Sequence, residues 1–196
     1  MTYQEILKQI REDAVATQDA TINCFAKTIV TMLGGTKTPH VKLAYGGFTG
    51  YLIESNSIRF KMPFSLTERK NVYAIAHECY HAFDYAGSPS KNHYSDEDRK
   101  IIENECGEYE YKYEFERKAE IFAYAFANFY MREVVGFNLP EETPYISESA
   151  KEKYPELVDI EKKMLVEYIL AKEEYRPLFE SYLEKLKIEF KVLSNL

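Results

Sequence analysis

Apolar residues in the first part of the chain recur three, four or eight positions apart between residues 6 and 33. This spacing gathers them on one face of a helix. Gly34 and Gly35 follow, and glycine commonly ends a helix because it adopts left-handed backbone angles without strain. The pattern therefore predicts a long amphipathic helix within residues 1–35.

From residue 41 the pattern changes to an alternation of apolar and polar positions, which is typical of half-buried strands. Three short segments carry this alternation: 41–45, 51–54 and 58–62. Glycine, serine and asparagine separate the segments, and Pro63 follows the last one. We expect a small antiparallel sheet of about three strands.

Helical spacing returns after these strands. A capping-box pattern at Ser65 and a stop at Gly87 bound one expected helix, and a second is expected over 109–135. The segment after the turn-rich residues 138–144 is again helical and highly charged, and we expect its two prolines to interrupt it or to begin new helices.

These elements define an α+β fold in which helices dominate. The chain contains no internal repeat and no linker long enough to separate two domains, so we expect a single domain over residues 1–196. Its expected parts are the N-terminal helix (1–35), a central core (41–136) and a helical C-terminal extension (140–196).

Composition and charge exclude several classes of protein. Lys and Arg number 25 against 32 Asp and Glu, and this net charge of −7 argues against a sequence-independent nucleic-acid binder. No apolar run is long enough to span a membrane, and the first residues lack the pattern of a secretory signal. The three cysteines have no short spacing, so we expect a reduced, cytoplasmic protein in which each is a small core residue.

The candidate chemistry begins at His77-Glu78-Cys79-Tyr80-His81, which has the form H-E-x-x-H. Residues four apart lie on the same face of a helix, so His77 and His81 can bind one metal ion from one rigid element. Glu78 then stands beside any water on that ion. Zinc suits two imidazoles and an oxygen ligand, and the pattern therefore predicts a zinc site.

A catalytic zinc commonly takes three protein ligands. A third histidine at the usual spacing is excluded because residue 87 is glycine, so we expect a carboxylate from a later helix. Glu116 is the best candidate, since the small residues one and two turns beyond it allow its helix to approach the metal helix closely. Glu120 is a rival ligand, and Glu110 and Glu114 are more remote ones.

The two motifs together resemble the ImmA/IrrE family of zinc metallopeptidases, within the broader gluzincin type. The resemblance covers roughly residues 41–131 and implies a zincin-like catalytic core in which the sheet packs on the H-E-x-x-H helix. The matching residues are His77, Glu78, His81, Glu116, Ala119, Phe122 and Ala123.

We therefore expect a hydrolase that cleaves a peptide or protein substrate with zinc-activated water and with Glu78 as the general base. Tyr85 and His93 are candidates for stabilising the oxyanion. The alternative is a zinc-stabilised, catalytically weak or inactive regulatory protein that binds a repressor or toxin. The tyrosine-rich run 103–120 is a candidate surface for such a partner, but we favour a solvated helix whose aromatic side chains pack inward. The sequence does not predict the oligomeric state, and it predicts neither a nucleic-acid nor a membrane partner.

Overall fold

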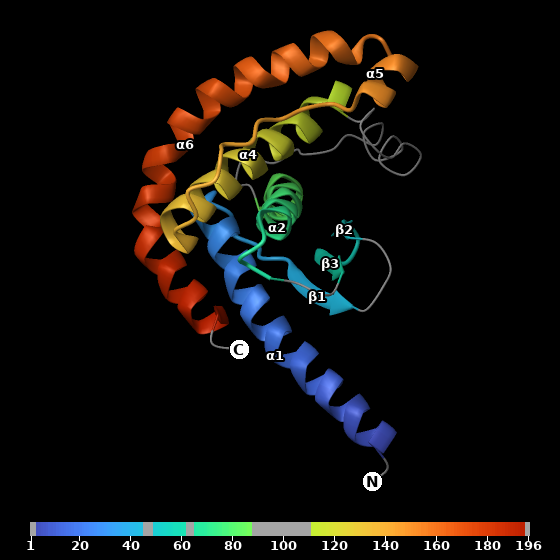
Figure 1. Ribbon diagram of the computed structural model, residues 1–196, viewed down its shortest axis with the longest axis vertical. Coiled ribbons are helices and arrows are strands. Elements are labelled where there is room, and N and C mark those ends of the chain that lie inside the picture. Colours follow the sequence, from blue (N-terminus) through green and yellow to red (C-terminus); the bar gives the residue numbers. More distant parts are fainter. Residues whose placement is uncertain (1–2, 45–48, 62–64, 88–110, 195–196) are drawn as a thin grey trace.

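The computed structural model describes residues 3–44, 49–61, 65–87 and 111–194 of the chain. The described part is predominantly helical and contains one small three-stranded sheet, which confirms the α+β class with helices dominant (Figure 1). Its elements are α1 (Tyr3–Met32), β1 (His40–Ala44), β2 (Gly50–Leu52), β3 (Ser57–Lys61), α2 (Arg69–Ala82), the π-helical turn η1 (Phe83–Gly87), α4 (Glu114–Tyr130), a second π-helical turn η3 (Met131–Val135), α5 (Glu148–Lys153) and α6 (Leu157–Ser194).

The helix α2, which carries the H-E-x-x-H residues, lies at the centre of the molecule. It contacts the sheet through β2 and β3, and it contacts α1 and α4 (Figure 1). The long helix α6 arches over the outside and packs against α4 and α1. The site residues of α2 therefore sit between the sheet and α4, within a frame that α1 and α6 complete.

The sheet is mixed, whereas an antiparallel sheet was expected. Its strand order is β1-β3-β2, with β2 antiparallel to β3 and β1 parallel to β3. A tight turn after β2, with Asn56 in the left-handed region at φ 44°, forms the β2–β3 hairpin. β1 pairs with the opposite edge of β3 and runs parallel to it. Alternation predicts which residues face the core, and here it is right, because Val41 and Ile58 are fully buried.

The predicted stop at Gly136 is confirmed, but both helices that hold the site begin later than expected. α2 begins at Arg69, and the Ser65 hydroxyl accepts a hydrogen bond from the Thr67 amide instead of capping the helix. Ser65 therefore stabilises a turn that precedes the helix. α4 begins at Glu114, five residues after the predicted start, and ends before Gly136, whose φ is 83°.

Gly34 and Gly35 end α1 as expected. Gly34 adopts a φ of 85°, and a Cβ on Gly35 would lie 2.5 Å from a methyl group of Val30. The chain therefore needs glycine at both positions, the first for its backbone angle and the second for its close approach to α1.

Pro177 does not end or begin a helix, contrary to expectation, because α6 continues through it. Pro177 is exposed on the outer side of α6, where water can bind the carbonyl group that proline cannot partner. Pro155 does precede a helix, since α6 begins two residues later.

Aromatic side chains from three helices form the main core. Phe25 of α1, Phe126 of α4 and Phe179 of α6 are almost completely buried, and the rings of Phe126 and Phe179 are 5.5 Å apart. Cys79 is also buried, as expected, whereas Cys24 is exposed on α1. The aromatic core joins α4 to both long helices, and the rings of Tyr80 on α2 and Phe122 on α4, 5.3 Å apart, join α4 to α2.

No helix among the described residues is both long enough and apolar enough to cross a membrane.

Candidate metal centre

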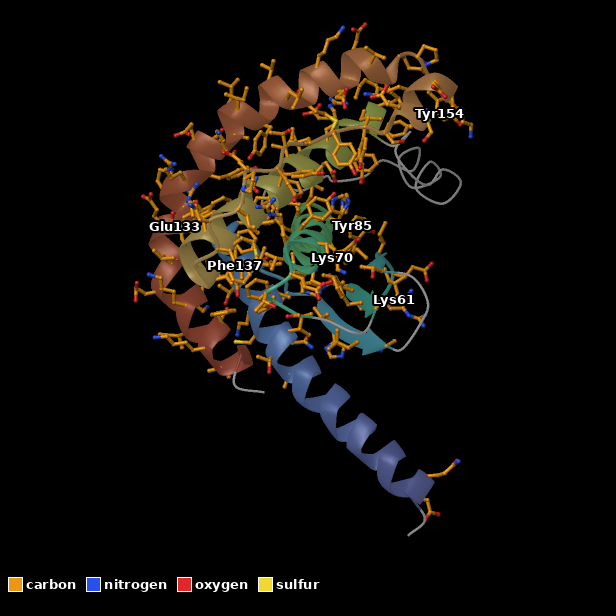
Figure 2. All side chains as sticks on the ribbon, viewed as in Figure 1. Lys61, Lys70, Tyr85, Glu133, Phe137 and Tyr154 are labelled. Carbon is orange, nitrogen blue, oxygen red and sulfur yellow. The ribbon has the colours of Figure 1, made fainter. Side chains whose placement is uncertain are left out.

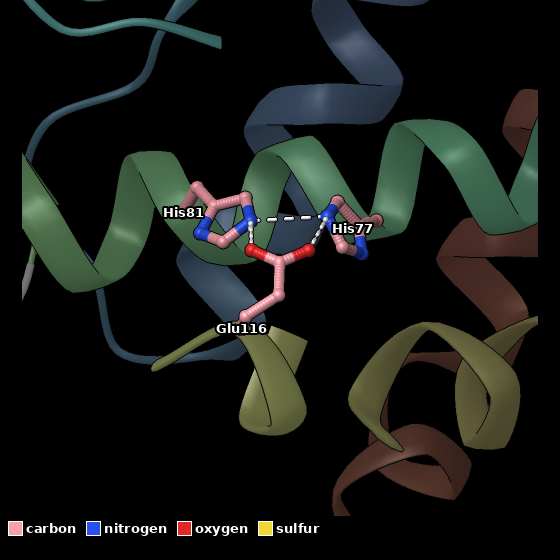
Figure 3. Close-up of side chains that lie close together, drawn as sticks. All are labelled: His77, His81 and Glu116. Carbon is pink, nitrogen blue, oxygen red and sulfur yellow. Dashed lines mark hydrogen bonds and ion pairs between the residues drawn. The ribbon is translucent and has the colours of Figure 1, made fainter. Parts of the chain in front are cut away.

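The side chains of His77 and His81 project from one side of α2 toward α4 (Figure 3). Val72, Ile75 and Cys79 are fully buried in the core, and their packing sets the rotation of α2 about its axis. The two histidines are four residues apart and therefore lie one turn from each other. Their Nε2 atoms are 3.0 Å apart, so both nitrogens point to the same place.

Glu116, in the first turn of α4, supplies the third group. Its two carboxylate oxygens lie 3.1 Å from His77 Nε2 and 3.1 Å from His81 Nε2 (Figure 3). Ala119 and Ala123, the small residues of the second motif, are completely buried and permit the close approach of α4 to α2. His77, His81 and Glu116 form the one group of metal-ligating side chains found in the described part of the chain.

The start of α4 is held in place by Arg117. The guanidinium group of this buried residue donates hydrogen bonds to the carbonyl groups of Tyr111 and Lys112, at 3.0 and 2.7 Å. These bonds join the segment before the helix to its first turn. They therefore support the position of Glu116, which is the adjacent residue.

The donor set fits a bound cation. If both imidazoles are neutral and carry their proton on Nδ1, the short contact between the Nε2 atoms brings two lone pairs together next to a carboxylate, and a cation bound among these atoms would offset that repulsion. The separations of 3.0 and 3.1 Å are also close to the ~3.3 Å between neighbouring ligands of a tetrahedral zinc ion with bonds of about 2.0 Å.

The same electrostatics govern the protein without a metal. Burial lowers the pKa of His77, but Glu116, Glu120 and Glu78 together outweigh burial and hold the pKa of His77 well above its usual value. Burial raises the pKa of Glu116, but the charges of His77 and His81 outweigh it and hold the pKa of Glu116 well below its usual value. A proton therefore supplies positive charge here when no metal does.

Glu120, named above as the rival ligand, faces the other nitrogen of the first histidine. Its Oε2 lies 3.3 Å from His77 Nδ1, although the angle is poor for a hydrogen bond. Glu120 also accepts hydrogen bonds from the hydroxyl groups of Tyr73 and Tyr111, the latter at 3.2 Å. A buried carboxylate held by two tyrosines thus supports His77 from behind.

The sequence reasoning did not identify the roles of Tyr73 and Tyr111. Tyr73 precedes His77 by one helical turn, and that spacing is a signal that indicates a neighbour of the site. Tyr111 belongs to the tyrosine-rich run 103–120, and it turns inward to Glu120, which agrees with the favoured interpretation of that run. The part of that run before Tyr111 lies outside the described residues.

The other predicted site residues are placed differently. Glu78 is half-buried on α2, and its charge contributes to the raised pKa of His77. The ring of Tyr85 packs 6.3 Å from that of Tyr51 on β2. Glu114 is exposed and pairs with Lys118, so it faces away from the histidines. His93 and Glu110 lie outside the described residues.

No family model matches this chain, and comparisons with curated proteins and with solved structures return no match.

Proposed function

We propose that this protein is a zinc-dependent metallopeptidase of the ImmA/IrrE type. The observation that carries the proposal is the convergence of His77 Nε2, His81 Nε2 and the Glu116 carboxylate, at separations of 3.0 and 3.1 Å. Two histidines on one helix and a carboxylate from a second helix match the ligand pattern of catalytic zinc sites, which keep a position for water.

The proposed chemistry is amide hydrolysis. A bound zinc ion would polarise the scissile carbonyl group and lower the pKa of a water molecule. Glu78, adjacent to His77 in the sequence, accepts a proton from the attacking water and later delivers it to the leaving amine. The carboxylate of Glu120, 3.3 Å from His77 Nδ1, favours a proton on Nδ1 and thereby leaves the Nε2 lone pair for the metal.

The identity of the metal is part of the proposal. Two histidines and one carboxylate also form the ligand set of some non-haem iron enzymes. The glutamate directly after the first histidine favours zinc hydrolysis, since a general base next to the metal has a role in peptide cleavage. Elemental analysis of the purified protein tests this choice, and we expect close to one zinc ion per chain.

The decisive experiment compares the zinc-loaded protein with its Glu78→Gln variant on a proteome-derived peptide library, with cleavage products read by mass spectrometry. Glu78→Gln keeps the size of the side chain but removes the base, so we expect unchanged zinc content and at least a ~100-fold loss of cleavage. Glu114→Gln is the matched control, because Glu114 is exposed on α4. Cleavage by Glu78→Gln at the wild-type rate would exclude Glu78 as the base.

A zinc-loaded wild-type protein that cleaves nothing would instead support the regulatory alternative. In that case the metal would stabilise the contact between α2 and α4, and the useful measurement would be the thermal stability with and without zinc. His81→Ala would then lose the stabilisation by zinc, since a metal that binds only the folded state stabilises it by mass action.

A further inference from the structure

α6 has apolar residues on two opposite faces over its first half. Its inner face is buried against the rest of the protein, with Met164 at 0% and Tyr168 at 1% exposure. Its outer face carries Val166, Ile169 and Leu170, which are 59%, 57% and 67% exposed. These three residues are spaced i, i+3 and i+4 and so form one continuous stripe, which we call the α6 outer stripe.

Packing of the monomer does not require the α6 outer stripe. A helix on a protein surface normally needs one apolar face, and the inner face already supplies it. Figure 1 shows α6 as the outermost layer, with α4 and α1 on its inner side. A contiguous exposed apolar patch marks an interaction surface more often than a scattered exposed residue does.

The charges that flank the stripe indicate what covers it. Lys162 and Lys163 precede the stripe, and Glu173 and Glu174 follow it by a similar number of residues. All four are exposed. The two lysines and the two glutamates lie at equal distances from the centre of the stripe, so in a reversed copy each lysine would face a glutamate.

We propose that the α6 outer stripe is a homodimer interface in which two copies of α6 pack antiparallel about a two-fold axis near the level of Tyr168. This arrangement places Val166 of one copy opposite Leu170 of the other. It also places Lys163 opposite Glu173 of the second copy, and Lys162 opposite Glu174. Each of these contacts occurs twice, because a two-fold interface is formed by the same patch on both copies.

Ion pairs that the lysines and glutamates make within one α6 do not prevent them from pairing with the second copy. Lys162 lies 2.8 Å from Asp159. Lys163 lies 3.7 Å from Glu167, and Glu173 lies 3.7 Å from Arg176, and all three pairs are within α6 and at the surface. Exposed pairs of this kind contribute only about 0–1 kcal/mol. The apolar stripe is small beside a standard interface of roughly 800 Å² per partner, so we expect a dimer with a Kd in the micromolar range or weaker.

The test is sedimentation velocity of the full-length chain from micromolar to near-millimolar concentration. We expect a concentration-dependent dimer. Lys163→Glu and Glu173→Lys each place like charges opposite one another at two positions, so each should weaken association about tenfold. The double variant K163E/E173K restores opposite charges and should recover the wild-type Kd.

A second pair of variants tests the apolar contact. Leu170→Ser should weaken the dimer, whereas Ile188→Ser, a matched control at an equally exposed position of α6 outside the stripe, should not. Circular dichroism checks that each variant keeps its helices. The proposal is overturned by a wild-type chain that stays monomeric throughout, by a dimer insensitive to Leu170→Ser, or by a double variant that associates no better than the single ones.

Discussion

At the scale of single residues, the two nitrogens of His77 face different carboxylates. Nε2 lies 3.1 Å from Glu116, beside His81 Nε2, whereas Nδ1 lies 3.3 Å from Glu120. A neutral imidazole can offer one nitrogen as a lone pair and use the other as a donor. We therefore propose that Glu116 binds the metal and that Glu120 orients His77.

Glu116→Gln tests the first assignment. The amide has the size of the carboxylate but no charge, so we expect zinc affinity to fall by more than a supporting partner would cost, that is, by more than about 100-fold. Competition with a chromophoric chelator measures the affinity. His40→Ala provides a control, because His40 is exposed on β1. An unchanged affinity in Glu116→Gln would remove Glu116 from the ligand set.

Glu120→Gln tests the second assignment. We expect a smaller loss of zinc affinity, about 10–100-fold, because the ligands remain while His77 loses its anionic support. Tyr111→Phe removes one hydrogen bond to Glu120 and should have a weaker effect in the same direction. A larger loss in Glu120→Gln than in Glu116→Gln would show that the two residues have exchanged roles.

The sequence could predict the pair of histidines and a short set of candidate carboxylates, but not which carboxylate faces which nitrogen of His77. The four-residue spacing of His77 and His81 depends only on the geometry of one helix. The choice between Glu116 and Glu120 depends on which turn of α4 crosses α2, and that is set by packing between distant segments. The inward packing of Tyr111 was the favoured interpretation of its run, but its contact with Glu120 was not predicted, for the same reason.

At the scale of elements, patterns predicted the helices and strands better than their order or their starts. Alternation fixes the buried face of a strand, and Val41 and Ile58 are buried as expected. Alternation does not indicate which strands are neighbours, so the parallel pairing of β1 with β3 could not be predicted from it. Ser65 matched a capping pattern, yet its hydrogen bonds form a turn before α2.

Pro177 gives a test at this scale. Proline within a helix costs about 3 kcal/mol relative to alanine, since it removes a hydrogen bond and crowds the preceding turn. Alanine also makes the unfolded chain more flexible, which offsets up to ~1 kcal/mol. We therefore expect Pro177→Ala to raise the free energy of unfolding by about 2–3 kcal/mol in urea titrations.

Glu180→Ala, at an exposed position nearby on α6, is the control and should change stability little. A lower stability of Pro177→Ala would contradict this expectation. It would mean that the curvature of this helix, visible in Figure 1, depends on the proline and that a straighter helix packs less well on α4 and α1.

At the scale of the whole molecule, α6 returns to the N-terminal helix and closes the frame around α2 and α4 (Figure 1). Figure 2 shows the described side chains that fill the space between these helices. The contact between α1 and α6 includes a buried acid, Glu189, which accepts hydrogen bonds from Thr28 and Cys24. Its second carboxylate oxygen is buried with no hydrogen-bond partner. An ionised carboxylate is costly in such a place.

Glu189 makes the stability of the contact between α1 and α6 dependent on pH. Burial raises the pKa of Glu189, although the hydrogen bond from Thr28 and the charge of Lys185 oppose this shift. The folded protein therefore binds this proton more tightly than the unfolded chain does. The resulting stabilisation is complete below the ordinary pKa of 4.5 and is lost as the pH rises through the raised pKa of the folded state.

Glu189→Gln removes this dependence, because the amide is neutral at every pH and still accepts the hydrogen bond from Thr28. We expect the variant to be more stable than the wild type at pH 7, and the difference in free energy of unfolding to shrink toward pH 4. Urea titrations at both pH values measure that difference, and Glu184→Gln, at an exposed position of α6, should show no such trend. A Glu189→Gln protein that is less stable than the wild type at pH 7 would mean that the ionised carboxylate itself holds α6 against α1.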